Sequence, residues 1–414
     1  MILHTIYIQH NDDQAIVDLH HSSMCLGSLS MSGAYDDLKV LDLTHVLAGP
    51  YATYLFALHG AEVIKIEPPG NLDCARGRGP HAALAQAGLG INYQTQATGK
   101  KSLLLDLQQE DGREVFRRLV KSADVLVENY RVGALEALGL GSAAMTAINP
   151  RLIYCSITGF GHGNSRSEVN AYDNVIQAAS GMMCQTGTSS EPRKVGASVI
   201  DYATGLSAAF AISTALSQRK ATGIGSVIDC AMFDTALTLM SPEAAALKSN
   251  IGEPKRLEAG LGTYQTASGR ITLGLFTPKQ NRTFWSAIGH DQFAALSDWK
   301  ALWDQAEPMR AELARRLLER SAEEWESWFH DLGLPAERVR TLQEAVNLPH
   351  LADRSFWHEQ HGVSLPLAPY GMSPGGPHVQ LAPPRPGQHT RPILLDAGLS
   401  EERIDSLEAG GVIA

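Results

Sequence analysis

The sequence predicts an α/β fold in which a doubly wound parallel sheet forms the larger of two domains. Short apolar runs that fit buried strands alternate with segments of helical periodicity through residues 38–160. This is the pattern of a parallel sheet covered by helices on both faces. The chain has 414 residues, more than one hydrophobic core normally serves, so a second, smaller domain is expected.

Five strands are predicted in chain order, with helices between them. The strands cover residues 38–43, 61–67, 102–107, 124–129 and 151–160. The first is followed by a helix with Pro50 in its first turn and Gly60 at its end, positions that favour these residues. The helix after the third strand has one apolar face, formed by Val115, Phe116, Leu119 and Val120.

The second half of the chain is predicted to be mainly helical. Helices are expected at residues 202–218, from 229 to about 248 and near 400–409. A hairpin is expected at 262–277 around Ala267-Ser268-Gly269, and further helices are expected between this hairpin and residue 334. We therefore divide the chain into four parts. They are a poorly ordered extension (1–37), a large domain (38–225), a small domain (226–335) and a return segment that completes the large domain (336–414).

Composition excludes several classes of function. The net charge of -10 argues against binding to nucleic acid or to an anionic membrane surface. The most apolar run, residues 203–216, is interrupted by Thr204, Ser207 and Ser213, so no membrane span is expected. The five cysteines are scattered without a C-x-x-C pair, which predicts neither a disulfide framework nor a metal site. Residues 1–37 lack the pattern of a signal peptide, so a cytoplasmic location is expected.

The first strand is followed by the sequence T-H-V-L-A-G-P, which has neither the G-x-G-x-x-G of dinucleotide sites nor a P-loop. The helix that opens at Ala48-Gly49-Pro50 still offers free backbone N–H groups to an anion. Ligands of such sheets bind at the carboxyl ends of the strands. A site for a phosphate-bearing ligand is therefore expected after the first strand.

Several long segments resemble one family, the class III CoA-transferases of the formyl-CoA transferase and carnitine CoA-transferase type. They are LKVLDLTHVLAGPYATYLFALHGAEVIKIEPPGNLDCARGRGP, GKKSLLLDL, ADVLVENYRVGALEALGLG, NPRLIYCSITGFG, AYDNVIQAASGMM, VGASVIDYATG and PGQHTRPILLDAGLS. The resemblance spans residues 38–413 and weakens between 257 and 377. It implies a Rossmann-like large domain, a small α/β domain and a homodimer of interlocked rings. It also implies acyl-CoA and a small carboxylic acid as substrates, with no metal.

The resemblance places the family's catalytic nucleophile at Asp201, within VGASVIDYATG. A carboxylate at this position would attack an acyl-CoA to form a mixed anhydride, and CoA would then form an aspartyl thioester. The position of Asp201 alone also fits an N-cap of the helix predicted at 202–218. The two roles are compatible.

Tyr172 and Asp173 are expected to be neighbours of Asp201 in the active site. The racemase branch of the family has a histidine-aspartate pair where this chain has Tyr172-Asp173. Because tyrosine titrates far above neutral pH, an acyl-CoA racemase or isomerase is the alternative function rather than the preferred one. Asp173 is expected either to position the acyl carbonyl or to cap a helix at 174–182. A catalytically inactive CoA-binding relative is the third possibility.

The resemblance also implies which positions contact CoA. They are Val46, Leu47, Ala48, Pro68, Arg76, Leu105, Gln108, Asn129, Tyr130, Arg131, Ala134 and Asn170. The family's formyl-CoA enzymes often have a polar residue at Leu47 and arginines at Pro68 and Ala137. We expect Arg76, Lys100 or Lys101 to replace the missing phosphate contacts, although a solvated surface position is the alternative for each. His45 is expected to make a structural hydrogen bond, and Gly260-Leu261-Gly262 is a short version of the family's mobile glycine loop.

Overall fold

The computed structural model describes residues 33–252, 257–360, 362–373 and 375–414. Most of the predicted extension, residues 1–32, lies outside the described residues. Its last part packs on the large domain, where the Tyr35 backbone N–H donates to the His59 carbonyl over 2.9 Å. The Tyr35 ring also lies 5.1 Å from the ring of Phe56.

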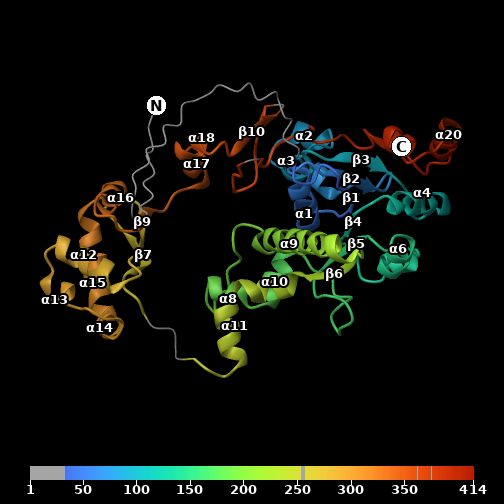
Figure 1. The fold of residues 1–414 in the computed structure, drawn as a ribbon. Helices are drawn as coiled ribbons and strands as arrows, with labels where there is room; N and C mark the ends of the chain where they lie inside the picture. Colours follow the sequence, from blue (N-terminus) through green and yellow to red (C-terminus); the bar gives the residue numbers. More distant parts are fainter. Residues whose placement is uncertain (1–32, 253–256, 361, 374) are drawn as a thin grey trace, which may run out of the picture.

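Six parallel strands form the main sheet, in the order β3-β2-β1-β4-β5-β6 (Figure 1). Their bounds are β1 Lys39–Leu43, β2 Glu62–Glu67, β3 Lys101–Leu104, β4 Val125–Glu128, β5 Ile153–Thr158 and β6 Ser226–Ala231. This is the strand order of a Rossmann-type sheet, and it confirms the predicted fold class. The order reverses between β1 and β4, which makes the carboxyl ends of these two strands the expected ligand site.

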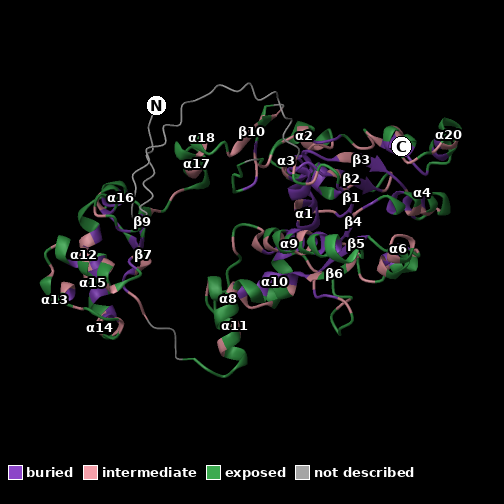
Figure 2. Ribbon diagram, in the orientation of Figure 1, coloured by how far each residue is buried: buried purple, intermediate pink, exposed green. Residues whose placement is uncertain are grey.

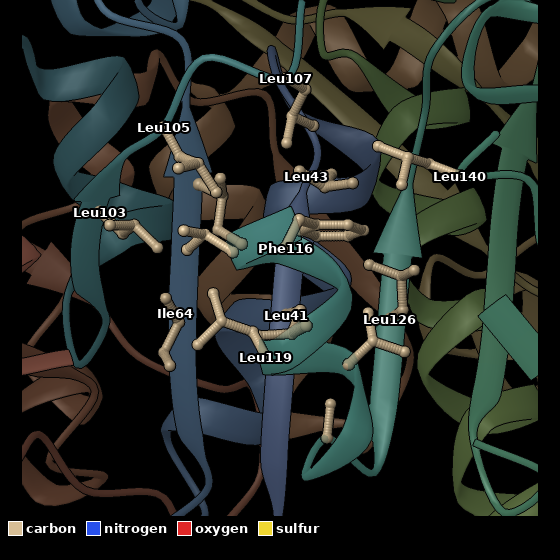
Figure 3. Packing of buried hydrophobic residues seen from close by; sticks show 14 of the residues in the cluster. Leu41, Leu43, Ile64, Leu103, Leu105, Leu107, Phe116, Leu119, Leu126 and Leu140 are labelled. Atoms are coloured by element: carbon tan, nitrogen blue, oxygen red, sulfur yellow. The ribbon is translucent and has the colours of Figure 1, made fainter. Parts of the chain in front are cut away.

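Strands β1 to β5 of this sheet are mainly buried because helices cover both faces (Figure 2). On one face lie α4 (Glu110–Lys121) and α6 (Ser142–Ile148), together with the C-terminal α19 (Thr390–Asp396) and α20 (Glu401–Ala409). Figure 3 shows Phe116 of α4 lying over Leu43 and Leu119 lying over Leu41 of β1. The apolar face predicted for this helix is therefore its core face.

The opposite face is covered by α1 (Ala48–Ala57) and α9 (Val199–Thr222), which pack against each other. Gly205 permits their close approach, because a Cβ at this position would lie 2.7 Å from the Ala48 carbonyl oxygen. By length and composition α9 is apolar enough to cross a membrane. In this fold it also packs against β5 and β6, as a core helix does.

Four predicted boundaries around the two sheets are wrong. Residues 226–231 form β6 rather than the approach to a helix from residue 229, so the large sheet extends beyond the division placed after residue 225. Helices α10 (Met232–Leu239) and α11 (Ser241–Lys248) follow β6. β9 (Ala336–Arg338) pairs with β8, so the small sheet continues beyond residue 335. The strand predicted at 102–107 ends at Leu104, since Leu105 bridges to Ile413 instead.

The small domain is an antiparallel sheet with helices. The predicted hairpin is β7 (Leu261–Gln265) and β8 (Arg270–Gly274), and the sheet order is β7-β8-β9. Its helices are α12 (Pro278–Ala287), α13 (Asp291–Ala294), α14 (Trp299–Asp304), α15 (Ala306–Arg316) and α16 (Ala322–Asp331). Figure 1 shows this domain standing apart from the main sheet.

The chain returns from the small domain to the main sheet through α17 (Leu342–Ala345), α18 (His350–Asp353) and the hairpin β10 (Trp357–Gln360) and β11 (Val363–Pro366). The C-terminal segment then joins the edge beside β3. The His389 backbone N–H donates to the Ser102 carbonyl over 3.0 Å, and that of Asp106 donates to the Val412 carbonyl over 2.8 Å. Residues near both ends of the described chain therefore share one core.

Candidate active site

A cavity of about 980 Å³ opens at the carboxyl ends of β1 and β4, where the sheet order reverses. Every position predicted to contact CoA lines it, except Arg76, and so do Tyr172 and Asp201. The predicted residues found there are Val46, Leu47, Ala48, Pro68, Leu105, Gln108, Asn129, Tyr130, Arg131, Ala134 and Asn170. These residues come from five separate segments of the chain. The sheet brings together what the sequence keeps apart.

The loop between β1 and α1, residues 44–47, forms part of the cavity wall. Side chains from other segments hold its backbone. The Thr44 N–H donates to the Asp42 carboxylate over 2.9 Å. The Asn129 amide accepts from the His45 N–H over 3.0 Å and donates to the His45 carbonyl over 2.8 Å. The predicted structural hydrogen bond of His45 is therefore made by its backbone, and Asn129 also has a structural role.

The helix that follows this loop begins with backbone N–H groups that have no hydrogen-bond acceptor among the described residues. Leu47 is the N-cap of α1 and provides no side-chain cap. The first N–H groups of a helix have no partner within the helix, and they carry its positive end. Leu47 and Ala48 both line the cavity, so these donors are near any anionic or carbonyl group bound there.

Three basic side chains expected near the phosphates lie elsewhere. Arg76 is 2% exposed, and its guanidinium forms an ion pair with Glu67 at 2.5 Å. Lys100 is fully buried, with its ammonium 2.8 Å from the Asp42 carboxylate. Lys101 pairs with Glu62 at the other end of the strands. The prediction that these cations replace missing CoA contacts is not supported by their positions.

Among the described residues that line the cavity, Arg131 is the one arginine, and no lysine lines it. It follows β4, is exposed, and has no ion-pair partner among the described residues. Its neighbour Tyr130 is half-buried, with its ring 6.0 Å from that of His45. A cation at the edge of the cavity with no protein partner suits the phosphates of a nucleotide.

Asp201 is the third residue of α9, which begins at Val199 with Ser198 as its N-cap. The predicted N-cap role of Asp201 is therefore wrong, since the helix begins three residues earlier than expected. The carboxylate is half-buried at the cavity wall and accepts no hydrogen bond from the described residues. Burial, and then the nearby charge of Asp173, raise the pKa of Asp201 to about 7.

Asp173 lies behind Asp201 and outside the cavity lining, with 5% of its surface exposed. It is the first residue of α7 (Asp173–Ala179) rather than a cap of a helix at 174–182. One carboxylate oxygen accepts from the backbone N–H groups of Ile200 and Asp201 over 2.8 and 3.3 Å. The other accepts from the Gln177 side chain over 2.6 Å. Asp173 therefore caps α9 from outside and holds Asp201 in place.

Comparison with known proteins identifies this arrangement. The sequence profile of CoA-transferase family III matches residues 35–390. The chain belongs to CoA-transferase family III. Among its relatives is acetyl-CoA:oxalate CoA-transferase of Acetobacter aceti, 32% identical over 82% of this chain and 90% of that protein. Human succinyl-CoA:glutarate CoA-transferase is 32% identical over 91% of this chain and 89% of its own length.

Solved structures agree with the family assignment. A CaiB/BaiF family protein from Brucella suis superposes with a TM-score of 0.75 and 30% identity, covering 88% of this chain and all of that one. A protein from Mycobacterium tuberculosis gives a TM-score of 0.79 at 27% identity, over 87% of this chain and 99% of that one. The chain is thus a CoA-transferase, an enzyme that acts on CoA thioesters.

Tyr172 lines the same CoA-transferase cavity as the predicted nucleophile Asp201. It is the N-cap of α7, it lines the cavity, and 60% of its surface is exposed. Met232, the first residue of α10, adds an apolar side chain to the same wall. The short glycine segment begins at Gly260, where a Cβ would lie 2.8 Å from the Leu275 carbonyl oxygen, and continues into β7.

Sequence reasoning missed two residues that shape the site of this CoA-transferase. Asp73 lines the cavity and accepts the backbone N–H of Val46 over 3.1 Å. Gly205 lies one helical turn after Asp201 and lets α9 approach α1. A glycine inside a long helix was the available signal for Gly205, because such a glycine usually marks close packing.

Proposed function

We propose that this enzyme moves CoA from an acyl-CoA thioester to a carboxylic acid, with Asp201 as the covalent nucleophile. The observation that carries the proposal is the state of the Asp201 carboxylate at the cavity wall. It is half-buried, it accepts no hydrogen bond from the described residues, and burial and Asp173 raise its pKa to about 7. A weakly solvated carboxylate is a better nucleophile than one in water.

The first half of the reaction transfers CoA to the enzyme. An oxygen of Asp201 attacks the thioester carbonyl carbon, the carbon–sulfur bond breaks, and CoA leaves as its thiolate. The product is a mixed anhydride of Asp201 and the acyl group. The thiolate then attacks the Asp201 carbonyl carbon, which releases the donor acid and leaves an aspartyl-CoA thioester.

The second half runs these steps in reverse with another acid. The acceptor carboxylate attacks the aspartyl thioester, releases the thiolate and forms a new anhydride. The thiolate attacks the acyl carbonyl carbon of that anhydride, so the new acyl-CoA forms and the Asp201 carboxylate returns. One thioester replaces another, and no net proton is taken up or released.

The lining of the cavity supports a position for CoA. The acyl end reaches Asp201 past Leu47 and Ala48, where the α1 N–H groups favour the negative charge that develops on the carbonyl oxygen. The nucleotide end lies toward the ends of β2, β3 and β4. Its phosphates are near Arg131, and the apolar surface for its base comes from Pro68, Leu105 and Ala134.

Relatives indicate which acids to try first. The names of these enzymes pair oxalate with acetyl-CoA, and mesaconate or glutarate with succinyl-CoA. All three acids are small dicarboxylates. We propose a small dicarboxylic acid as one substrate of this enzyme, with succinyl-CoA as the first donor to test.

We also propose that the enzyme works as a homodimer. Tyr202, Leu206 and Phe210 form one stripe of α9 and are 38%, 45% and 75% exposed. Val227, on the neighbouring edge strand β6, is 58% exposed. A second copy of the chain would cover this apolar surface.

The described cysteines, Cys74, Cys155, Cys184 and Cys230, are free thiols, which supports a reducing, cytoplasmic location.

Heavy-oxygen labelling tests the covalent mechanism. The enzyme is given succinyl-CoA and glutarate whose carboxyl oxygens are labelled. After several turnovers the peptide that contains Asp201 should carry heavy oxygen, because cleavage of the second anhydride leaves an acceptor oxygen on the aspartate. Labelled succinate together with an unlabelled Asp201 peptide would mean that the two acids react directly, and the proposal would be wrong.

A further inference from the structure

Val46 has a backbone conformation that valine rarely adopts. Its φ is 72°, and among the described non-glycine residues only Asn250 and Ser355 also have a positive φ. A β-branched side chain is disfavoured in this left-handed region, so the conformation persists only where the surroundings enforce it. Val46 lies in the β1–α1 loop, on the cavity wall.

The carboxylate of Asp73 contacts the backbone of Val46 directly. One of its oxygens accepts from the Val46 N–H over 3.1 Å and from the Ala75 N–H over 3.0 Å. The Asp73 backbone N–H donates to Glu67 at the end of β2 over 3.0 Å. Asp73 is itself 6% exposed, so its contact with Val46 is shielded from water.

Lys65 of β2 contacts both the carboxylate of Asp73 and the β1–α1 loop that contains Val46. Its ammonium lies 3.0 Å from the second carboxylate oxygen of Asp73 and donates to the Thr44 carbonyl over 2.7 Å. Only 1% of Lys65 is exposed. One buried cation therefore holds the β1–α1 loop two residues before Val46 and also holds the carboxylate that bonds to Val46.

The conformation of Val46 determines how the chain enters α1. The next residue, Leu47, is the N-cap of α1, and Ala48 is its first residue. A change of Val46 to a negative φ would rotate the following peptide and displace both residues. Leu47 and Ala48 line the cavity, so the shape of the proposed CoA path depends on one strained residue.

We propose that Asp73, held by Lys65, is a positioning residue that keeps Val46 in the left-handed conformation and thereby sets the affinity for CoA. The binding part of this inference rests on the proposed function, because it requires CoA to occupy the cavity. The conformational part does not.

A double-mutant cycle tests the coupling. Asp73→Ala is made in the wild-type and in the Val46→Gly background, and the dissociation constant for free CoA is measured by calorimetry. Glycine adopts a positive φ without strain, so it needs no hydrogen bond to hold it there. Asp73→Ala should weaken CoA binding by about tenfold or more in the wild-type background and by less than about threefold in the Val46→Gly background.

An equal loss in both backgrounds would overturn the proposal, because Asp73 would then act on binding by another route. The melting temperature of the same variants is measured as a separate readout of stability. Asp73→Ala should lower it in both backgrounds, since Lys65 loses its partner whatever residue occupies position 46. If Asp73→Ala does not accumulate as folded protein, Asp73→Leu, which is closer to aspartate in size and also lacks an oxygen to accept the Val46 N–H, is compared in the same two backgrounds.

A crystal structure of the ligand-free Asp73→Ala enzyme separates this proposal from the proposed function. The φ of Val46 should become negative, and a φ that stays near the 72° of the wild type would contradict the positioning role. If wild-type enzyme does not bind CoA, the proposed CoA site is wrong, while the conformation of Val46 still decides the role of Asp73.

Discussion

Two carboxylates of this enzyme have contrasting surroundings: Asp42 of β1 is fully buried and paired with Lys100, whereas Asp201 at the cavity wall is half-buried and has no ion-pair partner among the described residues. Burial alone would raise the pKa of Asp42, but Lys100 and Lys65 lower it to about 2. Burial and then Asp173 raise the pKa of Asp201 to about 7. The paired carboxylate maintains the shape of the loop, whereas the unpaired one remains available for chemistry.

Among the substitutions that test this comparison, that of Asp201 should have the largest effect on transfer activity. Asp201→Asn removes the nucleophile and should lower kcat/KM for transfer by roughly 10³-fold or more. Asp234→Asn is the matched control, because Asp234 is also the third residue of its helix but is exposed and outside the cavity lining. Its activity should be unchanged. Comparable losses in the two variants would remove the distinction between these aspartates.

The same comparison predicts opposite effects on stability. Asp42→Asn leaves Lys100 buried without its carboxylate and should destabilise the fold by about 3 kcal/mol. Asp201→Asn should stabilise the fold by roughly 1 kcal/mol at pH 8. A raised folded-state pKa means that the unfolded chain loses the proton first, so this gain should build up as pH rises from about 4, be complete above about 7 and vanish below pH 4. Urea unfolding at pH 8 and pH 5 measures both effects, and destabilisation by Asp201→Asn at pH 8 would contradict the comparison.

Gly205→Ala tests whether catalysis requires the close approach of α9 to α1. The added Cβ would lie 2.7 Å from the Ala48 carbonyl oxygen and 3.0 Å from a ring carbon of Tyr51. It should push α9 away from α1 and displace Asp201, with a loss in kcat of about 10- to 100-fold. Ser207→Ala, on the exposed side of α9, is the control. Normal turnover by Gly205→Ala would show that the spacing of α1 and α9 does not matter for catalysis.

Arg131 offers a smaller and more selective test. Arg131→Ala should weaken CoA binding by about tenfold and leave the affinity for pantetheine, which lacks the nucleotide, unchanged. Calorimetry with both ligands gives the comparison. Equal weakening of the two ligands would mean that Arg131 supports the cavity rather than the phosphates.

The pH dependence of kcat/KM tests the unpaired carboxylate of Asp201, and it has the smallest expected effect. Attack requires ionised Asp201, so kcat/KM should rise with pH and level off above about 7. Asp173→Asn removes a charge that raises the pKa of Asp201, so the midpoint of the profile should move to lower pH. A midpoint that moves to higher pH would contradict the electrostatic role given to Asp173.

The sequence predicts the parts of the molecule that local pattern determines. The strands of the large sheet from β1 to β5 are apolar runs, and they were predicted from those runs. β6 was missed because its residues alternate between half-buried and exposed, as in an edge strand, and they lead directly into α10. Small-domain strand β9 has three residues, too few to give a pattern.

Partners distant in sequence account for the errors at the site. Nothing near Arg76 indicates that its guanidinium pairs with Glu67 rather than with a phosphate. The role of Asp73 depends on a backbone N–H at Val46, 27 positions earlier. The family resemblance implied which positions contact CoA, but it did not indicate that one of them, Asn129, also holds the backbone of the cavity wall. That distinction depends on burial and pairing in three dimensions.

Mass spectrometry of the Asp201 peptide tests the central claim most directly. The enzyme is incubated with succinyl-CoA without an acceptor acid, quenched in acid and digested. We predict a CoA adduct on the peptide that contains Asp201, released by hydroxylamine and absent from the Asp201→Asn variant. Continued transferase turnover with no adduct on that peptide, or an adduct on another residue, would contradict the account.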